Sequence, residues 1–335
     1  MKQGITLLAL LILWSCQSTK EKPLAAIHQK HFVELGGEEQ YIEVISESLD
    51  NPVLLLVHGG PAWPQTPQTR YLNLDLAKDY TLVLWEQRGA GQSYLKNPTP
   101  DNMSLEQIIQ DGHQATAWAK KEFNMDKILL VGYSWGSIVG AYMAQQQPED
   151  YHAYVGVAQF INKSKGMEIA QSWLLEQATK ADDQADLVAL DSLKTAENYS
   201  NETEQFFRQW QLLNKYRGAV YNHEAEEVVQ KAMESYPDYQ GYDWFQVWRE
   251  SSAHLQDDLY NANVLEITEI DLPVYLIEGR HDWNVPSVLA TQWLDSLQAT
   301  SKKVIWFEGS GHGPLEEEPE KFNSSLSQIK SELGI

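Results

Sequence analysis

Short apolar runs recur along the chain, and most of them alternate with longer segments of helical periodicity. Continuous runs rich in branched residues predict buried strands at residues 53–57, 81–85, 128–131, 153–157, 274–277 and 304–307. Apolar residues at helical spacing predict helices at residues 104–123, 135–147, 287–298 and 319–333. Strands that alternate with helices form a mostly parallel sheet covered on both faces, so the pattern predicts an α/β fold.

The pattern changes in two places. Residues 31–35 and 41–45 alternate apolar and polar positions around Gly36-Gly37, which predicts a β-hairpin. Between about residue 160 and residue 270 the sequence is almost entirely helix-prone and polar, with tryptophans spaced through it. We interpret this segment as a helical cap inserted into one sheet domain, and we expect most of its tryptophans to pack between helices.

The chain of 335 residues has an ordinary length for an α/β domain with an insertion. The predicted parts are a signal peptide at residues 1–15, a tether at 16–29, a sheet domain at 30–160 and 270–335, and the helical cap at 161–269.

The first residues predict export. MKQGITLLALLILWSC has a lysine, then an apolar run from Ile5 to Trp14 that is too short to span a bilayer, which is typical of a signal peptide. Leu13-Trp14-Ser15-Cys16 resembles the bacterial lipobox, in which the cysteine is lipidated. Cys16 is also the only cysteine, so it has no disulfide partner within the chain. We expect a lipoprotein of the cell envelope, anchored to the membrane through Cys16; an ordinary cleaved signal is the alternative.

Composition and charge restrict the partners. The hydrophobic content of 43% is that of a globular protein. A formal net charge of -22 argues against nucleic acid as a partner and against adhesion to anionic lipid surfaces through the protein itself.

The segment VGYSWGSIVG at residues 131–140 carries the first candidate for chemistry. Ser134 lies between Gly132 and Gly136, after a strand-like run and before a helix-like one. This is the context of a nucleophile elbow, a sharp turn whose glycines avoid clashes where the backbone folds over itself. We therefore expect the Ser134 hydroxyl to be held out at the top of the sheet. A glycine-rich turn with an incidental serine is the alternative.

Two loops after the insertion supply the partners that such a serine needs. A serine hydroxyl is a poor nucleophile until a base takes its proton and a carboxylate orients that base. Asp282 follows the run at 274–277, and His312 follows the run at 304–307, each in a glycine-bearing loop. On a parallel sheet these groups emerge from the carboxyl ends of the strands. We therefore predict a triad in the chain order Ser134, Asp282, His312, which is the order of elbow-type hydrolases.

The oxyanion of such a reaction needs backbone donors. HGGP at residues 58–61 follows the first buried strand, where the second oxyanion donor of this architecture is found. The N–H groups of Gly60 and Trp135 are the candidates, because Pro61 has no N–H. We interpret His58 as a residue that braces this loop.

The remaining histidines are weaker candidates. His281 neighbours Asp282 in sequence, so its side chain should point elsewhere, and His113, His223 and His254 lie on helical stretches. His223-Glu224 is not followed by a second histidine at the spacing of the helical zinc signature. The sequence therefore indicates no metal site.

Five motifs in order carry a resemblance to a known family. They are HGGP at 58–61, EQRGAGQS at 86–93, GYSWG at 132–136, GRHD at 279–282 and GSGH at 309–312. Together they resemble the proline iminopeptidase (prolyl aminopeptidase) family of α/β-hydrolases. The resemblance implies an α/β-hydrolase fold, a serine triad that works through an acyl-enzyme without a cofactor, and removal of an N-terminal residue, often proline. Ala62, Glu86 and Tyr133 depart from the family's motifs HGGPG, DQRGxGxS and GGSWG, and these departures bear on substrate choice.

The same resemblance implies acidic cap residues that hold the substrate's free ammonium. Glu250 beside Trp248 is the first candidate, and Glu204 is the second; for each, an exposed helix glutamate is the alternative. Trp210 is followed by Gln211 where the family often has a tryptophan-glutamate pair.

Other functions remain open on the sequence. A cap of this kind also serves ester, amide and lactone hydrolases, and the fold does not decide among them. A third possibility is a catalytically inactive hydrolase used as a lipid-tethered binding protein, although every predicted triad member is present. The substrate is thus a small peptide or another acyl compound, and the sequence leaves the oligomeric state open.

Overall fold

A computed structural model describes residues 25–98, 102–193 and 203–335, with only the backbone for residues 203–206. The predicted signal peptide, Cys16 and most of the predicted tether lie outside these described residues.

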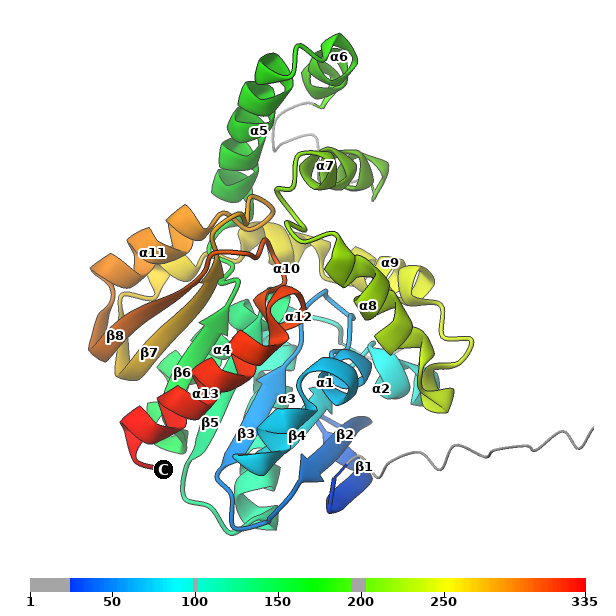
Figure 1. Cartoon of the computed structure of the whole chain (residues 1–335). Helices are drawn as coiled ribbons and strands as arrows, with labels where there is room; N and C mark the ends of the chain where they lie inside the picture. The colour runs from blue at the N-terminus through cyan, green and yellow to red at the C-terminus, as the bar shows by residue number, and fades with distance from the viewer. Residues whose placement is uncertain (1–24, 99–101, 194–202) are drawn as a thin grey trace, which may run out of the picture.

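A central sheet of eight strands forms the middle layer of the protein (Figure 1). The strands are β1 (Ile27–Leu35), β2 (Glu38–Ser46), β3 (Val53–Val57), β4 (Thr81–Glu86), β5 (Ile128–Tyr133), β6 (Tyr151–Val157), β7 (Glu269–Gly279) and β8 (Gln298–Phe307). Their order is β1-β2-β4-β3-β5-β6-β7-β8. The pairs β1–β2 and β2–β4 are antiparallel and the other pairs are parallel. The predicted fold, a mostly parallel sheet flanked by helices, is confirmed.

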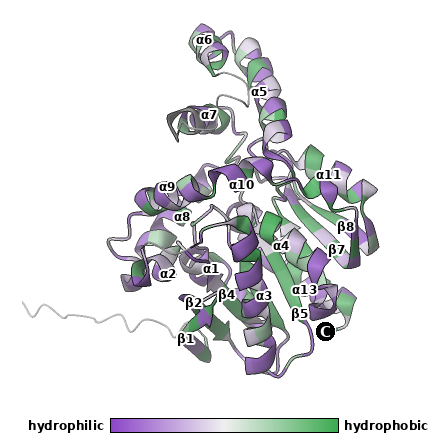
Figure 2. Ribbon diagram, turned by 180° about the vertical axis from the view of Figure 1, so that it is seen from behind, coloured by the Kyte–Doolittle hydropathy of each residue, from purple (hydrophilic) through white to green (hydrophobic). Residues whose placement is uncertain are grey.

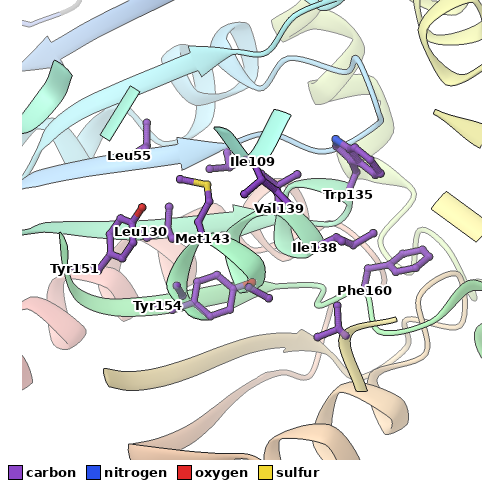
Figure 3. Packing of buried hydrophobic residues seen from close by; sticks show 14 of the residues in the cluster. Leu55, Ile109, Leu130, Trp135, Ile138, Val139, Met143, Tyr151, Tyr154 and Phe160 are labelled. Carbon is purple, nitrogen blue, oxygen red and sulfur yellow. The ribbon is translucent and has the colours of Figure 1, made fainter. Parts of the chain in front are cut away.

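Helices cover both faces of the sheet. Successive side chains of a strand point to opposite sides, so each strand contributes apolar side chains to both layers. On β3, Leu55 faces the helices α3 (Leu105–Glu122), α4 (Trp135–Gln146) and α11 (Ser287–Ser296), whereas Leu54 faces η1 (Leu74–Lys78) and α13 (Pro319–Leu333). Figure 3 shows Leu55 and Leu130 of the strands with Val139 of α4 in the first of these layers. The inner strands β3, β4 and β5 are therefore apolar along most of their length, while much of α3 is hydrophilic (Figure 2).

Two strand boundaries and three short helices differ from the sequence predictions. β1 begins at Ile27, inside the range 16–29 assigned to a tether, because Ile27 already pairs with Ser46 of β2. β8 begins at Gln298, where a helix was expected, and its first residues are polar because it is an edge strand. The short helices α1 (Thr66–Leu72), α2 (Gly91–Lys96) and α12 (Pro314–Glu317) were not predicted.

The segment between β6 and β7 is helical. It contains α5 (Lys163–Lys180), α6 (Gln184–Ser192), α7 (Thr203–Lys215), α8 (Glu224–Glu234), α9 (Trp244–His254) and α10 (Gln256–Asn261). In Figure 1, α5, α6 and α7 project away from the sheet, and α8 and α9 lie beside α1 and α2. Trp173 of α5 stacks on Trp283, with ring centroids 5.0 Å apart, so the cap also packs on the loop after β7. No helix of the described residues is long and apolar enough to cross a membrane.

Candidate active site

Ser134 lies in a strained turn between β5 and α4. Its backbone has φ 51° and ψ -117°, a combination that L-residues rarely adopt. A Cβ on Gly132 would lie 2.5 Å from the oxygen of Gly136, and a Cβ on Gly136 would lie 2.1 Å from the oxygen of Val57. The predicted need for glycine on both sides of Ser134 is therefore confirmed.

The structure brings Ser134, Asp282 and His312 together at the carboxyl ends of β5, β7 and β8. The Nε2 atom of His312 lies 2.9 Å from the Ser134 hydroxyl oxygen. The Nδ1 atom of His312 lies 2.8 Å from a carboxylate oxygen of Asp282. When the Nδ1–H group donates a hydrogen bond to Asp282, Nε2 carries the free lone pair that accepts a hydrogen bond from the serine hydroxyl. The arrangement can therefore remove the hydroxyl proton as Ser134 attacks an acyl carbon.

Asp282 and His312 hold each other in place electrostatically. Asp282 is 3% exposed, and its second carboxylate oxygen accepts a hydrogen bond of 2.8 Å from the N–H of Val285. Burial alone would lower the pKa of His312, but the nearby carboxylates of Asp282, Glu316 and Glu317 outweigh burial and raise the pKa. The imidazolium that forms when His312 takes a proton is stabilised in the same way.

The predicted oxyanion donors flank Ser134 in the structure. Trp135 is the first residue of α4, so its N–H has no acceptor within the helix. Gly60 lies in the loop after β3 and is exposed. Its neighbour Gly59 packs against the elbow, since a Cβ there would lie 3.2 Å from the Ser134 Cβ. Both candidate N–H groups therefore belong to segments that border the Ser134 hydroxyl.

Gln87, which the sequence analysis did not single out, ties these two segments together. Its backbone N–H donates to Nε2 of His58, and its side-chain amide donates to the oxygen of His58. Its Oε1 accepts from the indole N–H of Trp135, 3.0 Å away. Burial lowers the pKa of His58 to about 4, so the imidazole is neutral and accepts through Nε2. His58 braces the loop as predicted, and Gln87 carries that brace to the elbow.

The structure shows the surroundings of the three residues that depart from the family's motifs. Ala62 has φ 58°, in the region that favours glycine, and its methyl group is buried against the cap. Glu86 is fully buried, and its extra length fits because a Cβ on Gly91 would lie only 2.0 Å from its carboxylate. The ring of Tyr133 lies beside that of His312, with centroids 5.6 Å apart.

Of the two predicted ammonium-binding glutamates, only Glu250 has a described side chain, and its hydrogen bonds go to residues outside the triad. Glu250 is exposed on α9, and its carboxylate accepts hydrogen bonds from Tyr94 and Gln246. This face of α9 points to solvent, so the described residues form no desolvated site for an ammonium around Glu250. Glu204 belongs to α7, but its side chain is outside the described residues.

The other histidines do not reach Ser134. His281 stacks on Tyr221 of the cap, with ring centroids 3.6 Å apart, and so points away from its neighbour Asp282. His113 lies on α3 beside Gln146, His223 directly precedes α8, and His254 ends α9. Within the described part of the chain, no three His, Cys, Asp or Glu side chains are grouped as metal ligands.

Comparisons with known proteins show the family and the fold. Residues 52–319 match the family described as the alpha/beta hydrolase fold. The chain is 30% identical over 314 residues to a Bacillus subtilis (strain 168) protein named "Probable aminopeptidase YbaC", covering 92% of this chain and 97% of the relative. It is 24% identical to the proline iminopeptidase of Heyndrickxia coagulans, with 92% and 100% covered. Among solved structures, a proline iminopeptidase-related protein from Thermus thermophilus superposes with a TM-score of 0.66 at 17% identity, covering 92% of this chain and 98% of that one.

Proposed function

The chain belongs to the alpha/beta hydrolase family, and on that premise we propose that it is a serine hydrolase that works through an acyl-enzyme. The observation that carries the proposal is the continuous pair of hydrogen bonds from Ser134 through His312 to Asp282. The same pair argues against a catalytically inactive binding protein, because an intact triad has no use in such a protein.

The chemistry follows from the positions of the protons. Ser134 attacks the acyl carbon while its proton passes to Nε2 of His312, and His312 then gives that proton to the leaving group. Water, activated by His312 in the same way, hydrolyses the acyl-serine. The N–H groups of Gly60 and Trp135 stabilise the oxyanion in both steps.

Two substitutions test this assignment. We expect Ser134→Ala to abolish turnover and labelling by a fluorophosphonate while the fold is retained, because no other oxygen in the triad can attack. We expect Asp282→Asn to lower kcat on the order of 10⁴-fold, because His312 would lose its orientation and tautomer.

Matched controls are Ser324→Ala and Asp295→Asn, which change exposed side chains away from the triad. Labelling of Ser134→Ala at the wild-type rate would place the nucleophile elsewhere. Wild-type turnover by Asp282→Asn would show that another carboxylate orients His312.

For the substrate, we propose an aminopeptidase that removes an N-terminal residue. The names of the related proteins support this class. The charge on the substrate's ammonium needs a carboxylate in a partly desolvated site. Glu316 of α12 is the carboxylate that best meets this need, since it is partly buried and its charge acts on both His312 and Tyr133.

Contacts around Glu316 support a ligand there. One carboxylate oxygen lies 3.0 Å from the point that a Cβ on Gly313 would occupy, so the group folds back over the His312 loop. No hydrogen bond or ion pair to this carboxylate is found among the described residues. Burial raises the pKa of Glu316 to about 7, and a bound ammonium would favour the charged form.

An aromatic cluster of the cap adjoins the loop of Gly60 and offers a surface for an apolar side chain of the substrate. Trp63 lies close to Gly60, where a Cβ would be 3.2 Å from the Trp63 Cβ, and it contacts Trp244 and Phe245 of the cap, with ring centroids 5.2 Å and 5.6 Å apart. Phe207 and Trp248 extend this aromatic cluster. We therefore expect large apolar N-terminal residues to be accepted as well as proline.

Aminoacyl arylamides with free and N-acetylated amines test the substrate class. The wild type should hydrolyse the free-amine compounds much faster. Glu316→Gln should weaken the kcat/KM of free-amine substrates by about 30-fold or more, as for a buried charge pair that loses one member, while neutral acyl esters are nearly unaffected. Glu320→Gln is the matched control, since Glu320 is exposed on α13.

A wild type that hydrolyses free and acetylated amines equally would favour the second candidate, an ester, amide or lactone hydrolase. The exposed position of Glu250 is the observation that favours this second candidate.

We also propose that the chain is exported and anchored to the cell envelope through a lipid on Cys16.

A further inference from the structure

The connector between α7 and α8, residues 216–223, contacts both loops that carry the base and its orienting carboxylate. The oxygen of Gly218 accepts a hydrogen bond of 2.7 Å from the N–H of Trp283, the residue after Asp282. The oxygen of Ala219 accepts one of 2.7 Å from the N–H of His312 itself. One continuous segment of the cap backbone therefore connects the Asp282 loop to the His312 loop.

Glu317 of α12 joins the same connector to the His312 loop through its carboxylate. Its Oε1 accepts from the N–H groups of Gly311 and Gly313, at 2.9 Å and 3.2 Å. Its Oε2 accepts from the N–H groups of Tyr221 and Asn222, at 2.9 Å and 2.8 Å. One oxygen thus holds the residues on either side of His312, and the other holds the cap.

The backbone donors around His312 are completely accounted for by these contacts. The N–H groups of Gly311 and Gly313 go to Glu317, and that of His312 goes to Ala219. The close approach requires glycine at position 311, where a Cβ would lie 2.3 Å from the oxygen of Ala219. The backbone position of His312 therefore depends on Glu317 and on the docked connector together.

The hydrogen bonds favour the ionised form of Glu317. Four N–H groups surround its two oxygens, and none of them can accept a proton from a protonated carboxyl. Burial raises the pKa of Glu317, and the four N–H bonds oppose that rise. Its charge in turn raises the pKa of His312.

We propose that Glu317 is a positioning residue that couples the docked cap to His312, so that the Ser134–His312 pair is assembled only while the connector is in place. The inference rests on the proposed serine-hydrolase function. When the connector leaves, Glu317 loses two of its four donors, and the N–H groups of Trp283 and His312 lose their acceptors. Opening of the cap to admit substrate would then also switch the base out of position.

Glu317→Gln tests the coupling. The amide NH₂ would face two backbone N–H groups instead of accepting from them, so the His312 loop shifts. We expect kcat to fall about 10–100-fold for ester and arylamide substrates alike, since misplacement of about 1 Å has effects of that size. KM should stay within about twofold, because binding contacts are untouched. Glu320→Gln on α13 is again the matched control.

The pH profile distinguishes this role from a merely structural one. The titratable groups that face His312 are Asp282, Glu316, Glu317 and Tyr133. Removing the Glu317 charge lowers the pKa of His312, so the acid limb of kcat/KM should move to lower pH in Glu317→Gln. Amide hydrogen exchange should also quicken at residues 221–222 and at 311–313 in Glu317→Gln and not in the control Glu320→Gln.

A second variant approaches the coupling from the cap. Tyr221→Ala removes the stacking on His281 without touching Glu317, and it should lower kcat with KM unchanged and speed exchange at 311–313. This variant decides the matter if Glu317→Gln does not fold. Wild-type kcat in Tyr221→Ala while residues 218–222 exchange freely, or a wild-type kcat and pH profile in folded Glu317→Gln, would overturn the inference while leaving the hydrolase intact. A wild type that is neither labelled by a fluorophosphonate nor active on any acyl substrate would instead overturn the proposed function, and the inference with it.

Discussion

At the scale of single residues, the buried carboxyl of Glu86 shows what one extra methylene changes. It stands where the resemblance leads one to expect aspartate, and it accepts hydrogen bonds from Thr66, from the N–H of Gln92 and from Tyr239 of the cap. Burial raises the pKa of Glu86 to about 7 in spite of these donors. The longer side chain thus reaches the cap from the end of β4, and its ionisation becomes part of the stability of the fold.

The raised pKa of Glu86 predicts how stability depends on pH. Between its ordinary value near 4.5 and about 7, the folded protein keeps a proton that the unfolded chain releases, so the free energy of unfolding falls as pH rises through this window. Glu86→Gln cannot ionise, so it removes a decrease of about 3 kcal/mol across the window. Urea unfolding at a series of pH values measures this as a shallower slope in the variant. Parallel slopes for the two proteins would contradict the prediction.

The roles of residues that directly follow a predicted strand could be predicted from the sequence. The roles of residues that depend on contacts with distant parts of the chain could not. Ser134, Asp282 and His312 each follow an apolar run, which is why their approach was predictable. Gln87 also follows a strand, but its role depends on a loop 29 residues away in the chain. Glu317 reads as one of three consecutive glutamates, and only folding shows that it receives four backbone donors.

At the scale of elements, the cap is joined to the sheet through a buried cluster of charges. Arg70 of α1 donates to Glu43 of β2 and, through both terminal nitrogens, to Asp238 between α8 and α9. Glu43 also accepts from Tyr41 and contacts His28. Arg70 and Glu43 are nearly completely buried, whereas Asp238 is partly exposed. Arginine suits this position because its planar group reaches two carboxylates at once.

Replacement of Arg70 should therefore lower the stability of the fold. Arg70→Met leaves the buried Glu43 charge without its main partner, and we expect a decrease of about 3–5 kcal/mol in the free energy of unfolding. The matched control is Lys78→Met, which breaks only the exposed pair with Asp75 and should change stability by less than about 1 kcal/mol. Urea unfolding followed by circular dichroism measures both. Equal stability of the two variants would show that Glu43 is neutralised in another way.

The bounds of helices and strands could likewise be predicted only where the local sequence determines them. β3, β4 and β5 are buried on both faces, so their sequences are continuous apolar runs that could be recognised. The first half of β8 is an exposed edge and carries no such run, so only residues 304–307 were predicted as a strand and Gln298 fell within the predicted helix 287–298. The short helices α1, α2 and α12 are fixed by contacts with distant segments, which local periodicity does not encode.

At the scale of the whole molecule, the triad and the N-terminal strand lie at different ends of the sheet. The triad is at the carboxyl ends of the parallel strands, beneath the cap, whereas β1 forms the opposite edge of the sheet from β8 (Figure 1). A lipid tether leading into β1 would thus enter the protein away from α5, α6 and α7. The α5–α7 part of the cap would stay clear of the membrane, whereas the α8–α9 part is tied to β1 through the ion pair of Lys30 with Asp238.

The net charge of -22 makes this location testable, because it removes the main alternative explanation of membrane binding. A protein so acidic is repelled by anionic lipid, so attachment has to come from a hydrophobic anchor and should not weaken as salt screens charge. We expect the wild type to sediment with membranes in low and high salt and to be released by detergent. Cys16→Ala should appear in the soluble fraction or remain unprocessed, whereas Ser18→Ala, the matched control two residues away, should sediment like the wild type. Intact mass of the mature protein adds a direct measurement, because a lipidated N-terminal cysteine carries the mass of its acyl chains. A soluble wild-type protein whose mature chain begins at another residue would end the anchor proposal and leave the chemistry of Ser134 untouched.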